Sequence, residues 1–307
     1  MTGVGPRVRA AVHVRPRMGT LLALTLVGPR VAGERAARRA FETATALERS
    51  MSRFDPESDL NRIGAGSGRF VTVPAHLARA LALARRLARA TDGAFDPTVG
   101  PLTALWRRVG NDASPPPHAL RAARRVVGWR RLQVRRRKVR LDRGMALDLD
   151  GFGKGWAADR IVSAVRREAP LAGLVNFGES SLAVIGRPPG DRGWPVLVRD
   201  LDGGLAGWFV LGRGGCATSA GDPVTGRRAG VVDPRSGRRL DRRAQVTVLA
   251  PAAAVAEAAA TAMLVAGRGA LDALARRLGV QACWIDAGGL KTTPGFRLRS
   301  LDIAPRA

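Results

Sequence analysis

Short apolar segments joined by tight Gly and Pro turns recur along most of this chain, and they limit its fold more than any other feature. Turns this short connect antiparallel neighbours, because parallel strands need a longer crossover. Helical patterns interrupt the series, but not in the strict alternation of a doubly wound parallel sheet. The sequence therefore predicts an α+β (mixed α/β) fold. The predicted strands cover residues 20–27, 69–73, 145–149, 182–186, 195–199, 207–211, 245–249 and 282–286.

Helical spacing of apolar residues marks the segments between these strands. One helix is predicted over 31–51, and a second follows Pro74 and ends at Asp92-Gly93. Others are predicted from Gly155 to Pro170, from Pro251 to Ala266 and over 269–278. The fourth is almost entirely apolar, which predicts burial on all sides. The run Ser114 to Pro117 reads as a stiff break between lobes.

The chain is strongly basic, with 51 Lys and Arg against 25 Asp and Glu and a net charge of +26 over 307 residues. Such an excess, taken alone, favours a nucleic-acid or acidic-surface partner. Only three of the basic residues are lysines, however, and an Arg-rich, Lys-poor chain is typical of a GC-rich genome. The arginines are also spread along the chain, and aromatic residues make up only 5%. A nucleic-acid-binding protein therefore stays a remote alternative. An apolar content of 46% excludes a disordered chain.

Residues 21–27 follow several arginines and superficially resemble a signal peptide. The apolar run is short and breaks at Gly28-Pro29, and no small-residue cleavage site or lipid-accepting cysteine follows it. We therefore expect a first strand here. The chain has two cysteines and lacks an apolar run long enough to span a membrane. These features predict a cytoplasmic protein without a membrane span.

Two loops rich in Gly and Asp carry features of a binding site. Residues 91–102 hold two Gly, two Pro and two Asp, which favours a non-helical loop with free backbone amides. An ordinary helix–loop junction remains the alternative for this segment. Residues 147–156 end a strand in a Gly-rich turn that opens a helix and contains Lys154. Amides, helix dipole and ammonium would converge there on a phosphate. The spacing is neither that of a Walker A loop nor that of a dinucleotide fingerprint.

Glu257 and Thr261 are four residues apart, so they share one face of the apolar helix. A buried acid and hydroxyl need partners. Carboxylate and hydroxyl oxygens suit Mg²⁺, with water and phosphate completing its coordination. Alternatively, the threonine bonds to its own helix and the glutamate pairs with an arginine.

Eight motifs, in order over residues 18–267, resemble those of the ApbE family, the FAD:protein FMN transferases. Each motif alone is weak, whereas their order is specific. The motifs are Met18-Gly19-Thr20, Met51 to Phe54 with Ser58 to Arg62, Gly93-Ala94-Phe95-Asp96-Pro97-Thr98, Lys154 to Asp159, Val175 to Glu179, Ala217-Thr218-Ser219, Val232 to Gly237, and Glu257 to Thr261.

This resemblance implies an enzyme that uses Mg²⁺ and FAD to attach FMN to a threonine of an acceptor flavoprotein, releasing AMP. Its implied fold has largely antiparallel sheets flanked by helices, with the FAD cleft between lobes. Asp96 and Lys154 would be catalytic, with Lys154 beside the pyrophosphate. Mg²⁺ would be held by the Gly153 carbonyl, Glu257 and Thr261. The residues implied to line the FAD site are Met18, Phe54, Ala94, Phe95, Asp96, Asp150, Lys154, Trp156 and Val232.

The resemblance also implies three parts of the chain: a flexible basic N-terminus over 1–17, one flavin transferase domain over 18–285, and a C-terminal tail over 286–307. FAD and the acceptor flavoprotein would be its partners, without nucleic acid.

The chain departs from the family pattern at several positions. Glu257 stands where the family usually has Asp, so the metal geometry must adjust to a longer side chain. Gly230 stands where many members have His, which leaves a carboxylate such as Asp96, or water, to take the proton of the acceptor. These departures motivate an alternative: a family member that binds or hydrolyses FAD without transferring FMN.

Overall fold

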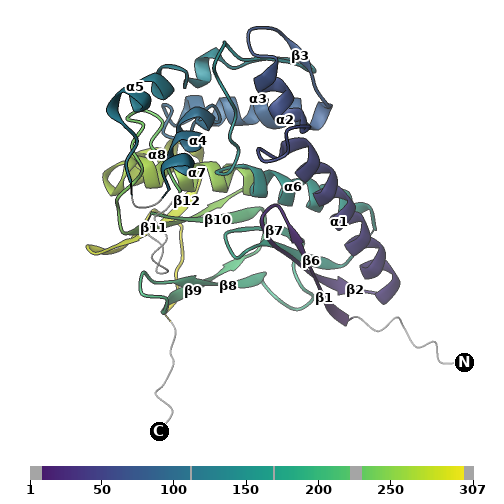
Figure 1. Cartoon of the computed structure of the whole chain (residues 1–307). Helices are drawn as coiled ribbons and strands as arrows, with labels where there is room; N and C mark the ends of the chain where they lie inside the picture. The colour runs from purple at the N-terminus through teal and green to yellow at the C-terminus, as the bar shows by residue number, and fades with distance from the viewer. Residues whose placement is uncertain (1–8, 111–112, 169, 222–229, 301–307) are drawn as a thin grey trace, which may run out of the picture.

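The computed structural model describes residues 9–110, 113–168, 170–221 and 230–300. Its largest element is an eight-stranded sheet in which every neighbouring pair is antiparallel. The predicted α+β fold with largely antiparallel sheets is therefore confirmed. In spatial order the strands are β1 Arg9–Arg17, β2 Thr20–Gly28, β6 Ala172–Phe177, β7 Ser181–Ile185, β10 Gly215–Ala220, β11 Ala244–Ala250, β12 Gln281–Asp286 and β13 Gly289–Thr292 (Figure 1).

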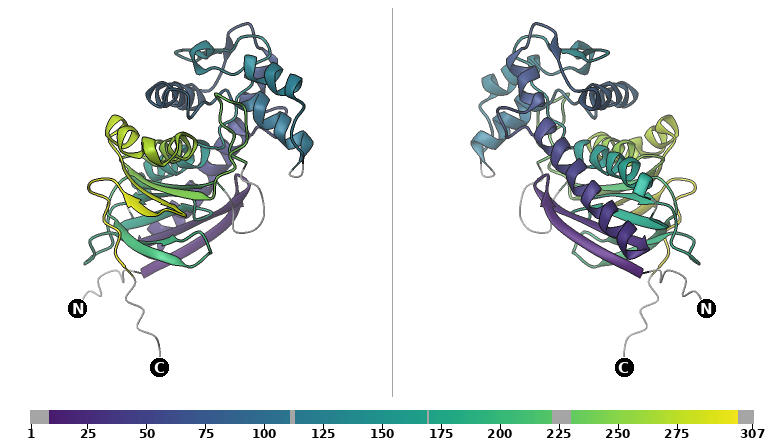
Figure 2. Two further views of the ribbon diagram at one scale, coloured as in Figure 1. Left: turned by 90° about the vertical axis from the view of Figure 1, so that its left-hand side faces the viewer. Right: turned by 90° about the vertical axis from the view of Figure 1, so that its right-hand side faces the viewer.

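Three helices cover one face of this sheet: α1 Arg30–Met51, α6 Gly153–Val165 and α7 Ala253–Ala266 (Figures 1 and 2). Alternate residues of the strands point into the core beneath them, because side chains on a strand alternate between its faces. Most side chains of α7 are buried, as its apolar sequence predicted, and α8 Leu271–Leu278 packs against it.

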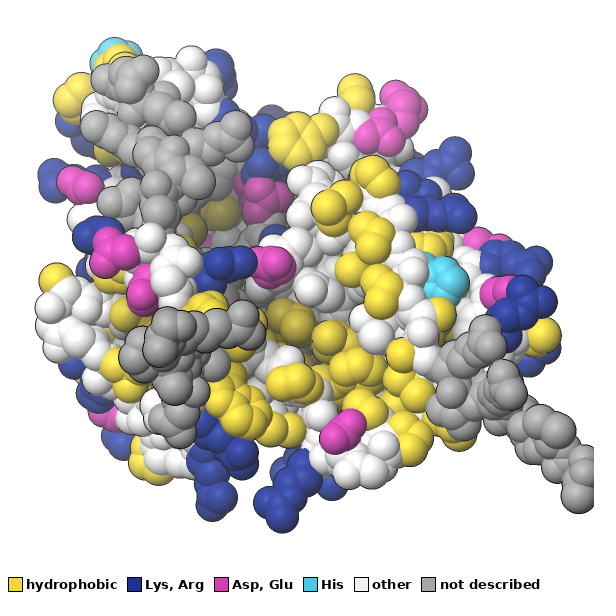
Figure 3. All heavy atoms as spheres, turned by 90° about the horizontal axis from the view of Figure 1, so that it is seen from below, with side chains coloured by type: hydrophobic (Ala, Val, Ile, Leu, Met, Phe, Trp, Pro, Cys, Tyr) yellow, Lys and Arg dark blue, Asp and Glu magenta, His cyan; other side chains and the backbone are white. Residues whose placement is uncertain are grey.

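The hairpin of β8 Trp194–Arg199 and β9 Leu205–Leu211 packs on the other face of the sheet, over a second apolar cluster. Near the sheet edge, Val12, Val14 and Leu21 stay exposed. Figure 3 views the molecule from below: hydrophobic side chains gather in the middle, and basic side chains lie scattered around them with acidic ones between. On this side, therefore, the arginines do not form one continuous basic surface.

A smaller lobe stands above the helices in Figure 1. A three-stranded sheet in the order β3-β5-β4 supports its helices. The core of the molecule continues from the large sheet into this lobe. Its elements are α2 Asp59–Ala65, β3 Val71–Thr72, α3 Ala75–Ala90, α4 Gly100–Val109, α5 Pro117–Arg125, a 3-10 turn at Trp129–Arg131, β4 Gln133–Arg135 and β5 Lys138–Arg140.

Several expected boundaries were wrong for identifiable reasons. The loop predicted over 91–102 ends at Gly100, where α4 begins with Pro101 at an allowed position. The expected break at Ser114 to Pro117 likewise runs into the start of α5. Within the described part of the chain, the expected strand over 145–149 makes a single bridge, between Ala146 and Val99.

The sequence interpretation also missed several elements, among them β1, β6, β10 and β13. It expected residues 1–17 to be flexible; residues 1–8 lie outside the described part, but residues 9–17 pair along the whole of β2. A strand at the sheet edge tolerates this basic composition. In the expected tail over 286–307, β13 pairs with β12, and residues 301–307 are outside the described part. No helix among the described residues is long and apolar enough to cross a membrane.

Candidate active site

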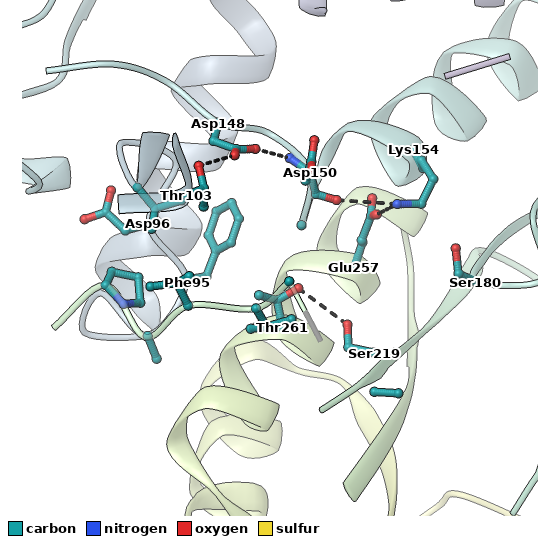
Figure 4. A pocket seen from close by; sticks show the side chains of 18 of the residues that line it. Phe95, Asp96, Thr103, Asp148, Asp150, Lys154, Ser180, Ser219, Glu257 and Thr261 are labelled. Carbon is teal, nitrogen blue, oxygen red and sulfur yellow. Dashed lines mark hydrogen bonds and ion pairs between the residues drawn. The ribbon is translucent and has the colours of Figure 1, made fainter. Parts of the chain in front are cut away.

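A cavity of about 280 Å³, termed the main cavity because most of the predicted site residues line it, lies between loops of the small lobe and the ends of the helices and strands below (Figure 4). It brings together chain segments that are far apart in sequence. Its lining residues are Arg53, Ala94, Phe95, Asp96, Val99, Thr103, Asp148, Asp150, Gly151, Lys154, Ser180, Thr218, Ser219, Ala220, Gly230, Val231, Val232, Pro234, Glu257 and Thr261.

Asp96 is buried in the Gly-Asp loop that precedes α4. One of its oxygens accepts hydrogen bonds from the backbone N–H of Thr98 at 2.8 Å and from the Thr98 hydroxyl at 2.7 Å. The other accepts from the backbone N–H of Trp129 at 2.9 Å. Burial raises the pKa of Asp96, although these hydrogen bonds oppose the shift. The loop therefore holds an oriented carboxylate in the cavity wall.

A second carboxylate, Asp148, anchors a network of charges. Its oxygens accept from the Thr103 hydroxyl at 2.6 Å and from the backbone N–H of Asp150 at 2.9 Å. Arg53 Nη1 contacts both carboxylates, at 2.6 Å from Asp148 and 2.5 Å from Asp150. Partial burial, together with the charge of Asp148, raises the pKa of Asp150 to about 6.

Glu257 and Lys154 form an ion pair in the cavity, with Nζ and Oε1 3.0 Å apart. The other oxygen of Glu257 accepts from the backbone N–H of Gly155 at 2.7 Å. The charge of Glu257 raises the pKa of Lys154, against the effect of burial, so the ammonium form is favoured. Glu257 thus pairs with a cation, as the alternative interpretation expected, but the cation is a lysine.

The start of α6 explains the Lys154 to Asp159 motif physically. Lys154 reaches the cavity, whereas Gly155 lies against the backbone of α7: a Cβ there would come within 2.4 Å of the Ala253 oxygen. Asp159 accepts hydrogen bonds from the backbone N–H groups of Ala253 and Ala254 and so caps α7. The motif therefore positions the two helices that carry Lys154 and Glu257.

Thr261 lies one turn after Glu257 on α7, with its hydroxyl 3.5 Å from the Ser219 hydroxyl (Figure 4). The backbone of Gly151 passes close to it, because a Cβ at Gly151 would lie 2.8 Å from the Thr261 oxygen. Gly153, whose carbonyl is a predicted ligand, lines the second cavity described below, and a Cβ there would point toward the methyl groups of Met18 and Met51.

A second cavity of about 320 Å³ adjoins the first. The exposed Phe54 ring lies at this cavity near two guanidinium groups, those of Arg53 at 4.5 Å and Arg107 at 5.6 Å from the ring centroid. Arg53, Asp150 and Lys154 line both cavities. The remaining lining residues of the second cavity are Met18, Gly19, Met51, Phe54, Leu149 and Gly153.

Most of the residues predicted for the site therefore lie on one cavity or the other. Trp156 lines neither: it is buried in the core and stacks on Phe152, with ring centroids 5.9 Å apart. The main cavity holds Ala94, Phe95, Asp96, Asp150, Lys154, Val232, Glu257 and Thr261, and the second holds Met18, Phe54 and Gly153.

Other cavity residues received no role in the sequence interpretation. Arg53 and Ser219 lie within motifs shared with the family, and these motifs could have indicated them as cavity residues. Thr103 and Ser180 carry no such signal, because long-range packing alone brings them to the cavity.

The donor atoms around Glu257 and Thr261 are oxygens, as a hard cation such as Mg²⁺ prefers. Lys154 already contacts one oxygen of Glu257, so metal and lysine compete for that oxygen. The described residues contain no group of three or more His, Cys, Asp and Glu side chains that could hold a metal. The site therefore fits a metal that keeps several ligands from water and phosphate, and not one enclosed by protein.

Comparison with known proteins matches residues 18–284 to the ApbE family. A FAD:protein FMN transferase of Rhodobacter capsulatus is 30% identical over 76% of this chain and 47% of its own length. One from Salmonella typhimurium is 29% identical over 91% and 86%. The crystal structure of the ApbE protein from Thermotoga maritima superposes with a TM-score of 0.85 at 24% identity, covering 93% of this chain and 97% of its own. Because the family match extends over most of the sequence, this chain belongs to the ApbE family.

Proposed function

We propose that this protein transfers FMN from FAD to a threonine hydroxyl of an acceptor flavoprotein, with Mg²⁺, and releases AMP. The observation that carries the proposal is the pair of adjoining cavities in an ApbE-family chain, with two cations, Arg53 and Lys154, on both. A dinucleotide has two bulky ends and an anionic middle, and this arrangement matches that shape and charge.

In the proposed reaction, the acceptor threonine oxygen attacks the phosphorus of the FMN half. The bond from that phosphorus to the bridging oxygen breaks, and the oxygen leaves with AMP. Lys154 binds the pyrophosphate and offsets its charge. When bound at Glu257 and Thr261, Mg²⁺ supplies further charge neutralisation for phosphoryl transfer. Glu257 is the side chain that this cation would share with Lys154.

Asp96 is our candidate for the base that takes the threonine proton. It lines the main cavity, and its raised pKa brings it closer to the range of an effective base. Gly230, at the position where the family resemblance implied a histidine, lines the same cavity. None of His13, His76 and His118 is on either cavity.

We also propose that the protein acts in the cytoplasm.

The absence of an imidazole from these cavities favours one second candidate: a protein that binds or hydrolyses FAD without labelling an acceptor. On the face that Figure 3 shows, the basic side chains are scattered and form no continuous surface for a nucleic acid.

The test is incubation of the protein with FAD, Mg²⁺ and an acceptor flavoprotein or a peptide from its modified region. We expect covalent flavin on the acceptor threonine, located by mass spectrometry, with one AMP released for each label. AMP release without label would support the second candidate. Neither AMP nor label from folded protein would refute transfer and hydrolysis, and a failure of that protein to bind FAD would refute both candidates.

A further inference from the structure

Arg53 lies two residues after the end of α1, at the boundary between the two cavities. Its side chain is only 17% exposed and lines both of them. The other cation at this boundary, Lys154, is bound to Glu257. The resemblance to the family gave Arg53 no role, so its position raises a separate question about what it binds.

The two carboxylates that hold Arg53 are unequal. The Asp148 side chain is 1% exposed and has further donors in Thr103 and the Asp150 backbone. The Asp150 side chain is 62% exposed. Breaking a buried ion pair is costly, whereas an exposed pair contributes little. Arg53 therefore has one fixed partner, Asp148, and one that can be exchanged, Asp150.

Arg53 also has unused capacity for hydrogen bonds. Both of its ion pairs use Nη1, and its Nε is buried without a hydrogen-bond partner in the described part of the chain. A guanidinium carries five N–H donors in a planar fork, which suits the oxygens of a phosphate. The Phe54 ring under the guanidinium restricts its orientation.

We propose that Arg53 binds the pyrophosphate of FAD, keeping its ion pair with Asp148 and releasing Asp150. The inference rests on the proposed function, because it requires a dinucleotide that passes from one cavity to the other. Arg53 and Lys154 would then bind the pyrophosphate from two elements, the end of α1 and the start of α6.

The competing explanation is that Arg53 has a structural role only, in which its ion pair with Asp148 holds the end of α1 against the segment around Asp148. The two explanations differ in which ligands a substitution affects. A phosphate ligand matters for FAD and ADP but not for riboflavin, which has no phosphate. A structural tie matters for thermal stability and for all three ligands alike.

The experiment measures the dissociation constants of FAD, ADP and riboflavin, and the melting temperature, for the unchanged protein, Arg53→Gln and Arg53→Lys. The matched control is Arg140→Gln, since Arg140 also has a buried Nε without a hydrogen-bond partner in the described residues, a nearby carboxylate in Asp142, and no place on either cavity.

We expect Arg53→Gln to weaken FAD and ADP binding about tenfold to a hundredfold and to leave riboflavin binding within about twofold. Arg53→Lys, which keeps the charge but loses the fork, should show a smaller loss, and Arg140→Gln none. If Arg53→Gln does not fold, the same selective loss in Arg53→Lys decides the question. Unchanged FAD and ADP binding, or an equal loss for riboflavin, would overturn the inference. Failure of the unchanged protein to bind FAD would overturn the proposed function and the inference with it.

Discussion

The two adjoining cavities differ in how their walls are built. In the main cavity, Asp96, Asp148 and Glu257 are buried, and each accepts at least two hydrogen bonds or ion pairs. Apart from the charged residues shared with the main cavity, the second is lined by two glycines, by Met18, Met51 and Leu149, and by Phe54, which is 72% exposed. Fixed polar groups suit a reaction centre, whereas methionine and an exposed ring adapt to the shape of a ligand.

Substitutions in the two walls should therefore have different consequences for turnover and for binding. A change in the main cavity removes a group whose partners are already in place, so it should affect turnover strongly. A change in the second cavity should affect chiefly the binding of one end of the substrate.

The largest effect is expected for Glu257→Ala. The change removes the proposed metal ligand and leaves Lys154 without its carboxylate, so AMP release should fall about a thousandfold. The matched control is Glu34→Ala, whose glutamate pairs with Arg30 on an exposed helix surface. Turnover within tenfold of the unchanged protein, measured at saturating FAD and Mg²⁺, would show that the main cavity does not depend on this carboxylate.

Asp96→Asn should slow flavin transfer about a hundredfold while FAD still binds. A base acts only when ionised, so the rate of the unchanged protein should rise with pH through the raised pKa of Asp96 and then level off. The variant should lose that rise. Rate profiles against pH, with melting temperatures for both proteins, test the assignment; superimposable profiles would remove Asp96 as the base.

Two glycines of α6 provide a test that concerns stability. A methyl group at Gly155 would meet the Ala253 carbonyl at 2.4 Å, so Gly155→Ala should lower the free energy of unfolding by about 3 kcal/mol. At Gly153 it would make ordinary contacts with the methionine methyl groups at 3.6 and 3.7 Å and with Leu149 at 3.9 Å, and Gly153→Ala should change stability by less than about 1 kcal/mol. Denaturant unfolding of both variants compares the packing of α6 against α7, which carry Lys154 and Glu257, with the wall of the second cavity. Equal free energies of unfolding for the two variants would show that the backbones of α6 and α7 do not pack as closely at Gly155 as the structure indicates.

Phe54→Ala should have the smallest effect. Loss of the exposed ring should weaken FAD and riboflavin binding by up to about tenfold, with little change in melting temperature. Phe70→Ala is the control, because Phe70 also lies under an arginine, Arg135, but on neither cavity. Fluorescence titrations with riboflavin give the affinity of each variant. Equal affinities for Phe54→Ala and Phe70→Ala would argue against Phe54 as a flavin contact.

The sequence predicted the fold class because turns and apolar periodicity are local properties. It predicted Asp96, Lys154 and Glu257 because they lie in ordered motifs. It did not predict the Lys154–Glu257 pair or the network around Arg53, since these join segments about a hundred residues apart. Trp156 shows the converse: its place in a motif indicated the site, but a motif residue can also serve to pack α6 in the core.

Competition binding with AMP and riboflavin tests whether one FAD molecule occupies both cavities. Each should bind in the presence of the other, because each occupies a separate cavity. Saturating FAD should exclude both. Competition between AMP and riboflavin, or a complex that holds FAD together with either of them, would show that FAD does not occupy both cavities.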